Sequence, residues 1–394
     1  MPTPGNILIY RLGSLGDTVI ALPCFRLIRD TYPGSKITLL TNHPVSGKAA
    51  PAMAVLENSG LCDEAVNYPV GTRSAHELAK VRRTIRQIQP QVLINLAAGR
   101  GWLKSLRDHL FFRSCGIKNI VGTPFRRRDL QVRQTNGGEF EPESQRLASR
   151  LASIGAVNLA DQRFWELGLT QAERNQALEL LPSHRKNFIA VSVGTKLPVK
   201  DWGEENWERL LVFLSREMPD ITLVLLGSAD EWERSEKMSR VWTGGHINLC
   251  GKTSPRISAA ILERCRLFIG HDSGPMHLAS AVGVPTLGLF SWHNPPGQWF
   301  PGHRSWKFIK TLYPALPRDG WKAALQMKRG VSEGIRLLQP NDVLRSAIEL
   351  WHGDSTASLC YARNQSYINA LRPKPLPLEK TTNNYYAKPL GLSS

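Results

Sequence analysis

The stretch "LFIGHDSGPMHLASAVGVPTLGLF" at Leu267–Phe290 decides the fold class. In it an apolar run, Leu267–Gly270, is followed by a helix-period segment, Gly274–Val282, and then by a second apolar run, Thr286–Phe290. A helical connection of this length predicts parallel strands, because antiparallel neighbours are usually joined by short turns. The stretch therefore predicts one β–α–β unit of a parallel sheet.

The same alternation of apolar runs and helix-period segments extends over most of the chain. Further strands are predicted at Asn6–Tyr10, Lys36–Thr41, Val92–Leu96, Asn119–Gly122, Phe188–Val193 and Ile221–Leu226. Further helices are predicted at about Glu204–Glu217, Ser254–Arg264 and Asn341–Trp351. Because 394 residues exceed the usual size of one core, we expect an α/β fold with two doubly wound, Rossmann-like domains that face a cleft.

The domain boundary is expected in a polar stretch near the middle of the chain. Leu169–Asn187 opens on the capping pattern Thr170 to Glu173 and ends in "PSHRKN". The predicted division is a first domain over 1–168, a linker over 169–187, a second domain over 188–340 and a closing helix over 341–352. The composition of Ser291–Gln339 indicates a functional loop or a partly ordered insertion. The composition of residues 353–394 indicates a disordered tail.

Charge is unevenly distributed along the chain. The net charge is +17, and residues 71–135 alone hold fourteen Lys or Arg against three Asp or Glu, a net +11. Such a zone could face nucleic acid, an anionic membrane or a phosphorylated substrate, or it could be a solvated face. Arg126, Arg127 and Arg128 are its densest focus, and no nucleic-acid-reading motif accompanies them.

Several classes of protein are disfavoured by the sequence. The six cysteines show no CxxC and no zinc-type spacing with histidine, so reduced, mostly buried thiols are expected rather than a zinc site. No secretory signal is recognised, and no apolar run approaches the roughly 18 residues of a membrane span. We therefore expect a cytoplasmic protein.

The loop "RLGSLGD" at Arg11–Asp17 follows the first predicted strand and has two interpretations. It could be a dinucleotide-binding turn, or it could present the Asp17 carboxylate. A dinucleotide fingerprint needs G-x-G-x-x-G and an acidic residue after the second strand, whereas this loop is G-x-x-G and the second strand ends in Thr41 and Asn42. The pattern favours a tight turn at Gly13 and Gly16 that presents Asp17.

Three later loops carry candidate binding residues, each with a plainer alternative. Thr195, Lys196 and Lys200 could hold a phosphate or form a solvated turn. Ser273 and Gly274 begin a helix whose amides would attract an anion, while Asp272 could be only its N-cap and His277 only a core residue. Glu231, with Glu233 in reserve, could bind a ribose or simply complement a helix dipole.

Three motifs occur in a specific order and spacing: R-L-G-S-L-G-D, then G-T-K-L-P-V-K-D-W, then D-S-G-P-M-H-L-A. Over roughly residues 6–293 the chain resembles glycosyltransferase family nine, the ADP-heptose:lipopolysaccharide heptosyltransferases. The resemblance implies the GT-B arrangement and an inverting transfer of a sugar, heptose above all, from a nucleoside-diphosphate sugar such as ADP-heptose. The implied acceptor is the lipopolysaccharide core or a related glycan, with no cofactor and no metal.

The resemblance also implies roles for single residues. Asp17 matches the general base and Lys200 the cation on the diphosphate, while Thr195 and Lys196 fall beside the same phosphates. The implied donor-binding residues further include Glu231, Thr253, Asp272, Ser273, Gly274 and His277. The implied acceptor-binding residues are Arg11, Gly13, Ser14, Gly16, Arg126, Arg127 and Arg128.

The partners that the resemblance implies are a nucleotide sugar, an anionic glycolipid and the inner membrane surface; no nucleic acid is expected. The stretch "SWHNPPGQW" after Phe290 departs from the family pattern, which leaves the donor sugar and the acceptor open. The competing hypotheses are a nucleotide-sugar epimerase of the same two-domain shape and a non-enzymatic nucleotide- or RNA-binding protein.

Overall fold

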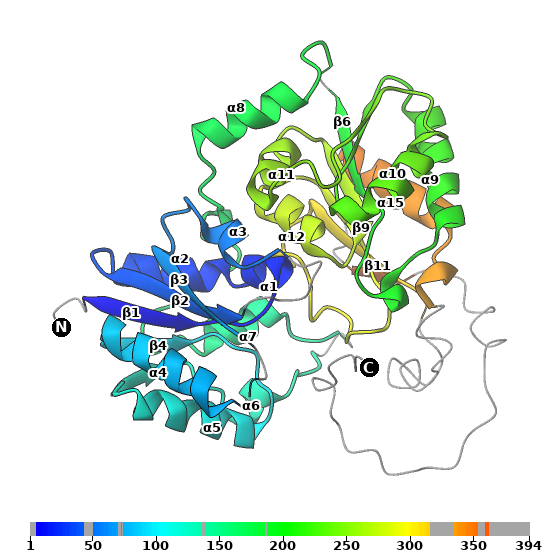
Figure 1. The fold of residues 1–394 in the computed structure, drawn as a ribbon. Coiled ribbons are helices and arrows are strands. Elements are labelled where there is room, and N and C mark those ends of the chain that lie inside the picture. The colour runs from blue at the N-terminus through cyan, green and yellow to red at the C-terminus, as the bar shows by residue number, and fades with distance from the viewer. Residues whose placement is uncertain are drawn as a thin grey trace, which may run out of the picture.

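The computed structural model describes residues 5–42, 50–69, 72, 74–135, 139–185, 187–315, 334–353 and 359–361. Within these ranges it forms two domains, each built on one parallel sheet with helices on both faces (Figure 1). No helix in the described part of the chain is long and apolar enough to span a membrane.

The first sheet has five parallel strands in the order β3-β2-β1-β4-β5. Its strands are β1 (Asn6–Tyr10), β2 (Lys36–Asn42), β3 (Glu64–Tyr68), β4 (Val92–Asn95) and β5 (Asn119–Val121). Ile7 and Ile9 of β1 pack with the core under α1 (Leu15–Ile20) and α2 (Leu22–Thr31). Leu8 and Tyr10 pack with α4 (Ala75–Ile88) and α5 (Trp102–Ser114) on the other face. This two-sided burial explains why β1 is almost uniformly apolar.

The second sheet has seven parallel strands in the order β12-β11-β10-β9-β6-β7-β8. Its strands are β6 (Phe188–Ser192), β7 (Thr222–Leu225), β8 (His246–Asn248), β9 (Leu267–His271), β10 (Thr286–Leu289), β11 (Ile309–Tyr313) and β12 (Leu359–Tyr361). One face is covered by α9 (Glu204–Glu217), α10 (Trp232–Ser239) and α15 (Pro340–His352), and the other by α11 (Pro255–Leu262) and α12 (Gly274–Ala281). The β–α–β unit expected at Leu267–Phe290 is confirmed as β9–α12–β10.

Four strands are absent from the sequence prediction, and each has a physical reason. β3 reads EAVNY, with polar residues between the apolar ones, and β8 has only three residues. β11 contains Lys310, whose ammonium pairs with Glu349 of α15, so a charged residue interrupts an otherwise buried run. A strand at β11 and a short 3-10 helix at Gly334–Leu337 correct the expectation that Ser291–Gln339 is only loop or insertion.

The tail prediction is wrong for one short segment. β12 lies inside 353–394 and pairs in parallel with β11, so main-chain hydrogen bonds to a sheet edge order residues that lack sequence periodicity. Residues 354–358 and 362–394 of that prediction, and 316–333 of the preceding stretch, lie outside the described residues.

The two sheets reverse their strand order at comparable places. In the first sheet the reversal lies between β1 and β4, and in the second between β6 and β9. Open α/β sheets bind ligands beyond the carboxyl ends of the strands at such points. The loops after β1, β6 and β9 are the ones that carry the candidate motifs.

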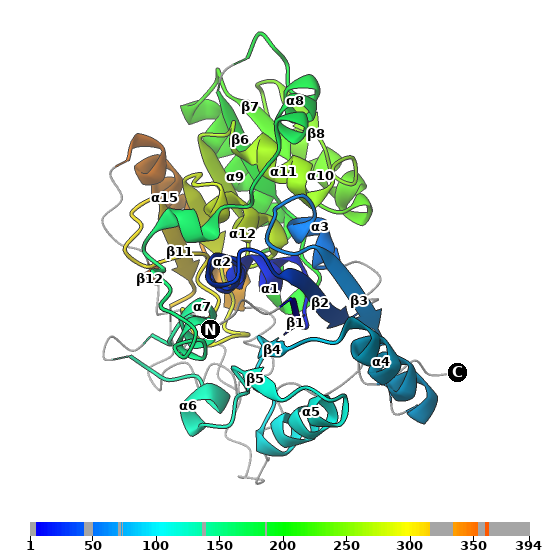
Figure 2. The ribbon, with the colours of Figure 1, turned by 90° about the vertical axis from the view of Figure 1, so that its left-hand side faces the viewer.

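Helices from both domains pack against each other and share one apolar core. Val19 of α1, Val55 of α3 (Met53–Leu56) and Met276 of α12 belong to the same buried cluster. Figures 1 and 2 agree in placing α1 and α3 beside α11 and α12. Because α1 follows β1 and α12 follows β9, this joint brings the chain after β1 close to the chain after β9.

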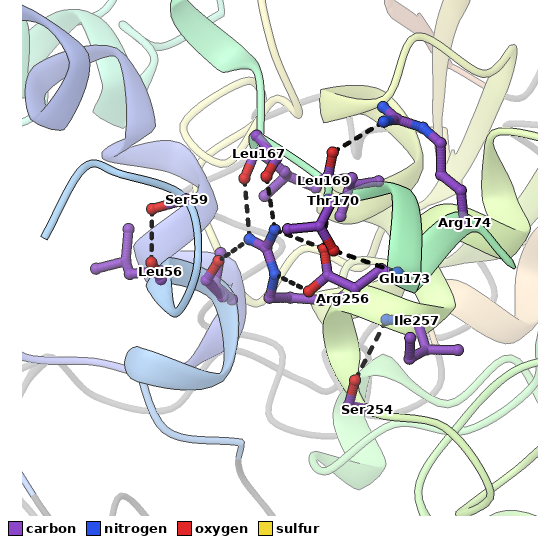
Figure 3. Close-up of polar contacts among 12 residues, drawn as sticks. Leu56, Ser59, Leu167, Leu169, Thr170, Glu173, Arg174, Ser254, Arg256 and Ile257 are labelled. Atoms are coloured by element: carbon purple, nitrogen blue, oxygen red, sulfur yellow. Dashed lines mark hydrogen bonds and ion pairs between the residues drawn. The ribbon is translucent and has the colours of Figure 1, made fainter. Parts of the chain in front are cut away.

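A buried arginine ties the joint together (Figure 3). Arg256, at the start of α11, donates to the carbonyl oxygens of Val55, Leu167 and Gly168 at 2.8–2.9 Å. Its guanidinium also makes a bidentate pair with Glu173 of α8 (Gln171–Leu180). Glu173 in turn completes the predicted capping box, accepting from the Thr170 amide at 2.7 Å, so this capping prediction is confirmed. One side chain of the second domain thus fixes the first domain, the connecting segment and α8.

Replacing Arg256 with methionine is expected to lower the free energy of unfolding by about 3–5 kcal/mol at neutral pH, because it leaves a buried carboxylate unpaired. Burial raises the pKa of Glu173, but the bonds from Arg256 and Thr170 outweigh it and hold that pKa below its ordinary value. A depressed carboxyl pKa stabilises the fold above the unfolded-state pKa of about 4.3 and loses that effect as pH falls through the folded-state value. The penalty should therefore shrink in acid.

Urea unfolding of the Arg256→Met protein at neutral and acidic pH measures this effect. The matched control is Arg174→Met on α8, whose half-exposed guanidinium pairs with Glu263 and should cost no more than about 1 kcal/mol. Equal effects for the two variants would mean that Arg256 is not a structural tie.

Candidate active site at the domain joint

The loop after β1 holds the Asp17 carboxylate in one orientation. Asp17 Oδ2 accepts from the Ser14 amide at 2.9 Å and from the Ser14 hydroxyl at 3.2 Å, which caps α1. Gly13 has φ +136°, and a Cβ there would lie 2.5 Å from Asp17 Cγ. A side chain at position 13 would therefore displace the carboxylate, so the glycine is needed where the sequence predicted a tight turn.

Arg11 lies under this loop and is almost completely buried. Its guanidinium donates to the carbonyl oxygens of Leu96 at 2.6 Å and of Asp17 at 2.7 Å. The nearest carboxylate oxygen of Asp17 is 3.9 Å away, and the Asp17 side chain keeps 30% of its surface exposed. Arg11 thus supports the loop from the interior of the first domain, and the Asp17 carboxylate remains accessible to a ligand.

A second group of residues gathers at the start of α12. Lys200 Nζ lies 2.5 Å from Asp272 Oδ2, and His277 Nε2 lies 3.8 Å from Asp272 Oδ1. Burial raises the pKa of the Asp272 carboxyl, but Lys200 and His277 outweigh it and hold that pKa well below its ordinary value. The N-cap of α12 is Ser273. The alternative that Asp272 is only the N-cap of this helix is therefore wrong.

Two buried polar atoms beside this group have no hydrogen-bond partner among the described residues. They are Ser273 Oγ and His277 Nδ1. Buried polar groups in folded proteins are normally paired, so unpaired ones require an explanation. Their position at a helix N-terminus next to an ammonium group fits an anionic or hydroxyl-rich ligand.

Glycines bring the two groups of residues together across the joint. A Cβ on Gly16 would lie 2.9 Å from His277 Cδ2, and a Cβ on Gly274 would lie 2.8 Å from Leu15 Cδ2. The N-terminal turns of α1 and α12 therefore touch. Gly16, which the resemblance implies to be an acceptor-binding residue, lies against a residue of the other domain.

A histidine whose role was not predicted from the sequence fixes the loop that carries Lys200. His271 is fully buried at the end of β9, accepts from the Trp202 amide through Nε2 and donates to the Gly194 carbonyl through Nδ1, both at 3.1 Å. Burial lowers the pKa of His271 to about 4, which agrees with the neutral ring that these bonds require. Asp201, bidentate with Arg234, braces the same loop.

Glu231 lies at the carboxyl edge of the second sheet. A Cβ on Gly194 or on Gly227 would overlap its carboxylate, and Oε2 accepts from the Ser228 amide at 2.8 Å. Burial raises the pKa of Glu231, and the Ser228 bonds and Lys196 oppose that rise. The reserve candidate, Glu233, is exposed.

Lys196 connects the two domains electrostatically. Partial desolvation lowers the pKa of its ammonium, and the carboxylates of Asp17 and Glu231 oppose that shift. Lys196 therefore lies within the electrostatic reach of Asp17 in the first domain and Glu231 in the second. These residues and the Lys200 group form one site made by both domains.

The remaining candidates lie at the edges of this site. The Thr195 hydroxyl accepts from the Leu197 amide at 3.4 Å, and the Thr253 hydroxyl is paired with Ser258 at 2.8 Å.

Arg126, Arg127 and Arg128 are exposed at α6 (Arg127–Leu130). A Cβ on Gly99, which follows β4, would lie 2.6 Å from the carbonyl oxygen of Asp129. The three arginines are therefore near the carboxyl edge of the first sheet.

The loop after β10, which departs from the family pattern, also reaches the site. Asn294 Nδ2 lies 3.5 Å from Asp272 Oδ2. Burial, and next to it the Lys200 charge, lowers the pKa of His293. The same loop crosses to the first domain, where the Phe140 amide donates to the Pro296 carbonyl at 2.8 Å. Ser291–Gln298 is thus a bridging loop beside the candidate donor site.

Known proteins resemble this chain in sequence and in fold. Residues 138–317 match the model of glycosyltransferase family 9 (heptosyltransferase). The lipopolysaccharide core heptosyltransferase OpsX of Haemophilus influenzae is 24% identical over 299 residues, which is 74% of this chain and 80% of that protein. Lipopolysaccharide heptosyltransferase 3 of Escherichia coli is 26% identical over 27% of this chain and 31% of its own length.

Solved structures give the same result at the level of the fold. A family 9 glycosyl transferase from Veillonella parvula has a TM-score of 0.67 at 19% identity, covering 88% of this chain and 97% of its own. E. coli ADP-heptose heptosyltransferase II has a TM-score of 0.61 at 17% identity, covering 89% and 100%. E. coli WaaC with ADP-2-deoxy-2-fluoro heptose has a TM-score of 0.57 at 16% identity, covering 87% and 99%. The two Rossmann-like domains form a GT-B fold.

Proposed function

We propose that this chain acts as a member of glycosyltransferase family 9, the heptosyltransferases, and moves a heptose from ADP-heptose to an anionic lipopolysaccharide-core acceptor with inversion at the anomeric carbon. The heptosyltransferase relatives and the solved WaaC complex with an ADP-heptose analogue support this choice of donor. The observation that carries the proposal is the contact across the domain joint between Gly16, the neighbour of Asp17, and His277 of the Lys200–Asp272–His277 group.

Asp17 is proposed as the general base. Its carboxylate takes the proton from the acceptor hydroxyl while that oxygen attacks the anomeric carbon, and the nucleoside diphosphate leaves from the opposite face. A single displacement of this kind inverts the anomeric centre. The bond from the Ser14 amide and the brace from Arg11 keep the carboxylate pointed at the acceptor.

The leaving diphosphate is proposed to bind at the start of α12. Negative charge grows on the departing phosphate oxygens, so the Lys200 ammonium and the free amides of Ser273 and Gly274 stabilise the transition state more than the ground state. The Lys200 ammonium is paired with Asp272, which positions it at the start of α12. Lys196 and Thr195 are proposed to bind the same phosphates.

The other parts of the two substrates follow from the same arrangement. Glu231 is proposed to accept hydrogen bonds from the ribose hydroxyls, Thr253 to lie near the base, and Asn294 to contact the donor sugar. The acceptor is proposed to bind the first domain, where Arg126, Arg127 and Arg128 would pair with its phosphates and carboxylates. The enzyme would then act at the membrane surface that holds this lipid.

Nucleotide binding gives the first test of the proposed donor. ADP at saturating concentration is expected to raise the melting temperature by several degrees, because a ligand bound only by the native state stabilises it. UDP, GDP and NAD should have smaller effects. A transfer assay with ADP-heptose and a truncated lipopolysaccharide then separates glycosyl transfer from epimerisation of the donor. Stabilisation by NAD alone, or by none of these nucleotides, would contradict the proposal.

A further inference from the structure

Helix α5 has apolar side chains on a face that nothing in the described chain covers. Trp102 is 52% exposed, Leu103 75% and Leu110 58%. Only Ser105 and Phe112 of this helix are buried. A helix with apolar residues on both its inner and outer faces is normally buried on both, so the outer face of α5 is unusual for a surface helix.

Basic side chains are interspersed with these apolar ones. Leu103 and Leu110 lie two helical turns apart on one stripe, with Arg107 between them. Acidic residues are few in this region, and two of them are engaged with arginines: Asp108 with Arg100 and Arg107, and Asp129 with Arg128. The face therefore presents apolar side chains within an excess of positive charge.

The apolar and basic surface continues onto both neighbouring elements. A groove of about 600 Å³ between α4 and α5 has Leu78 and Phe111 together with Arg82, Arg83 and Arg86 in its walls. On the other side, the ring of Phe125 lies 5.3 Å from that of His109 on α5 and directly precedes Arg126. In both views α5 lies at the end of the molecule away from the second domain (Figures 1 and 2).

We propose that this α5 face, made by α5 with Leu78, Phe125 and the neighbouring arginines, docks the protein onto an anionic lipid bilayer. Leucine and tryptophan side chains enter the boundary between headgroups and acyl chains, and arginines on the same face attract anionic headgroups. The inference deepens the proposed function, on which it rests for the membrane-borne acceptor. It assigns the part of the first domain that would meet the membrane carrying the acceptor.

Two other occupants fit the α5 face less well. A second copy of the chain would place arginines against arginines across a two-fold axis, which opposes association. Single-stranded nucleic acid could stack bases on Trp102 and Phe125, but the most exposed apolar side chains of the face are Leu103 and Leu110, which give no base stacking. An anionic bilayer is complementary both to the charge and to the aliphatic side chains.

Vesicle co-sedimentation tests the proposal without donor or acceptor. The full chain should bind vesicles of phosphatidylcholine mixed with an equal amount of phosphatidylglycerol, bind phosphatidylcholine vesicles poorly, and lose affinity as salt rises. Leu103→Gln combined with Leu110→Gln should weaken binding by at least about tenfold. Leu178→Gln on α8, which removes a leucine that is 49% exposed and lies outside the basic region, should bind like the wild type.

Several results would overturn the inference. These are equal binding of neutral and anionic vesicles, unchanged binding by the double variant with an unchanged melting temperature, and a wild-type dimer that the double variant converts to a monomer. Transfer to a detergent-dispersed acceptor without vesicle binding would remove this inference alone. Vesicle binding without any transfer would remove the proposed function and leave the docking surface.

Discussion

The Asp17→Asn protein is expected to bind ADP as the wild type does and to turn over about 10²–10⁴-fold more slowly. This is the usual contribution of a positioned general base. Asparagine has the size of aspartate and keeps an oxygen that accepts from the Ser14 amide, so the loop after β1 should retain its conformation. The nucleotide is proposed to bind residues of the second domain, and its affinity should therefore be preserved.

Initial rates of transfer and calorimetric titration with ADP measure the two quantities separately. The matched control is Asp30→Asn, which neutralises an exposed carboxylate on α2 of the same domain and should leave both unchanged. Full turnover by Asp17→Asn would remove Asp17 as the base. A parallel loss of ADP affinity would instead indicate that the substitution disturbs the joint between α1 and α12.

Much of the fold could be predicted because buried parallel strands leave a strong sequence signal. β1, β6 and β9 are apolar at nearly every position since both faces of each sheet are covered. β3 and β8 could not be recognised, because both are partly exposed edge strands and β8 has only three residues. Their polar residues are typical of loops.

The candidate site could likewise be predicted only in part. Motifs at strand ends identified Asp17, Lys200 and Asp272, because parallel strands bring their carboxyl ends to one edge. Contacts between motifs depend on the strand order and on how the domains pack, which single motifs do not encode. The approach of Gly16 to His277 and the hydrogen bonds of His271 therefore emerge only from the structure.

The Lys200→Met protein is expected to lose both nucleotide affinity and turnover, the latter by about 10²–10³-fold, which is typical of removing one group that stabilises a developing negative charge. The same change should also destabilise the fold, because it leaves the Asp272 carboxylate buried without its ammonium partner. Loss of activity in this variant alone could therefore reflect lost stability rather than lost catalysis.

The pH dependence of stability identifies the structural part of this effect. Lys200 and His277 outweigh burial and depress the pKa of Asp272 in the folded protein. The stabilisation is therefore fully present above the unfolded-state pKa of about 3.9 and is lost as pH falls through the folded-state value. The stability difference between the wild type and Lys200→Met should be largest near neutral pH and should decrease in acid.

A charge-balanced double variant separates stability from catalysis. Combining Lys200→Met with Asp272→Asn removes both members of the pair, so the melting temperature should recover most of what the single variant loses. ADP affinity and turnover should stay low, because no ammonium then lies at the start of α12 to meet the diphosphate. Recovery of turnover together with stability would show that Lys200 only compensates Asp272. The positive charge for the leaving group would then have to come from Lys196, the other lysine of the loop after β6.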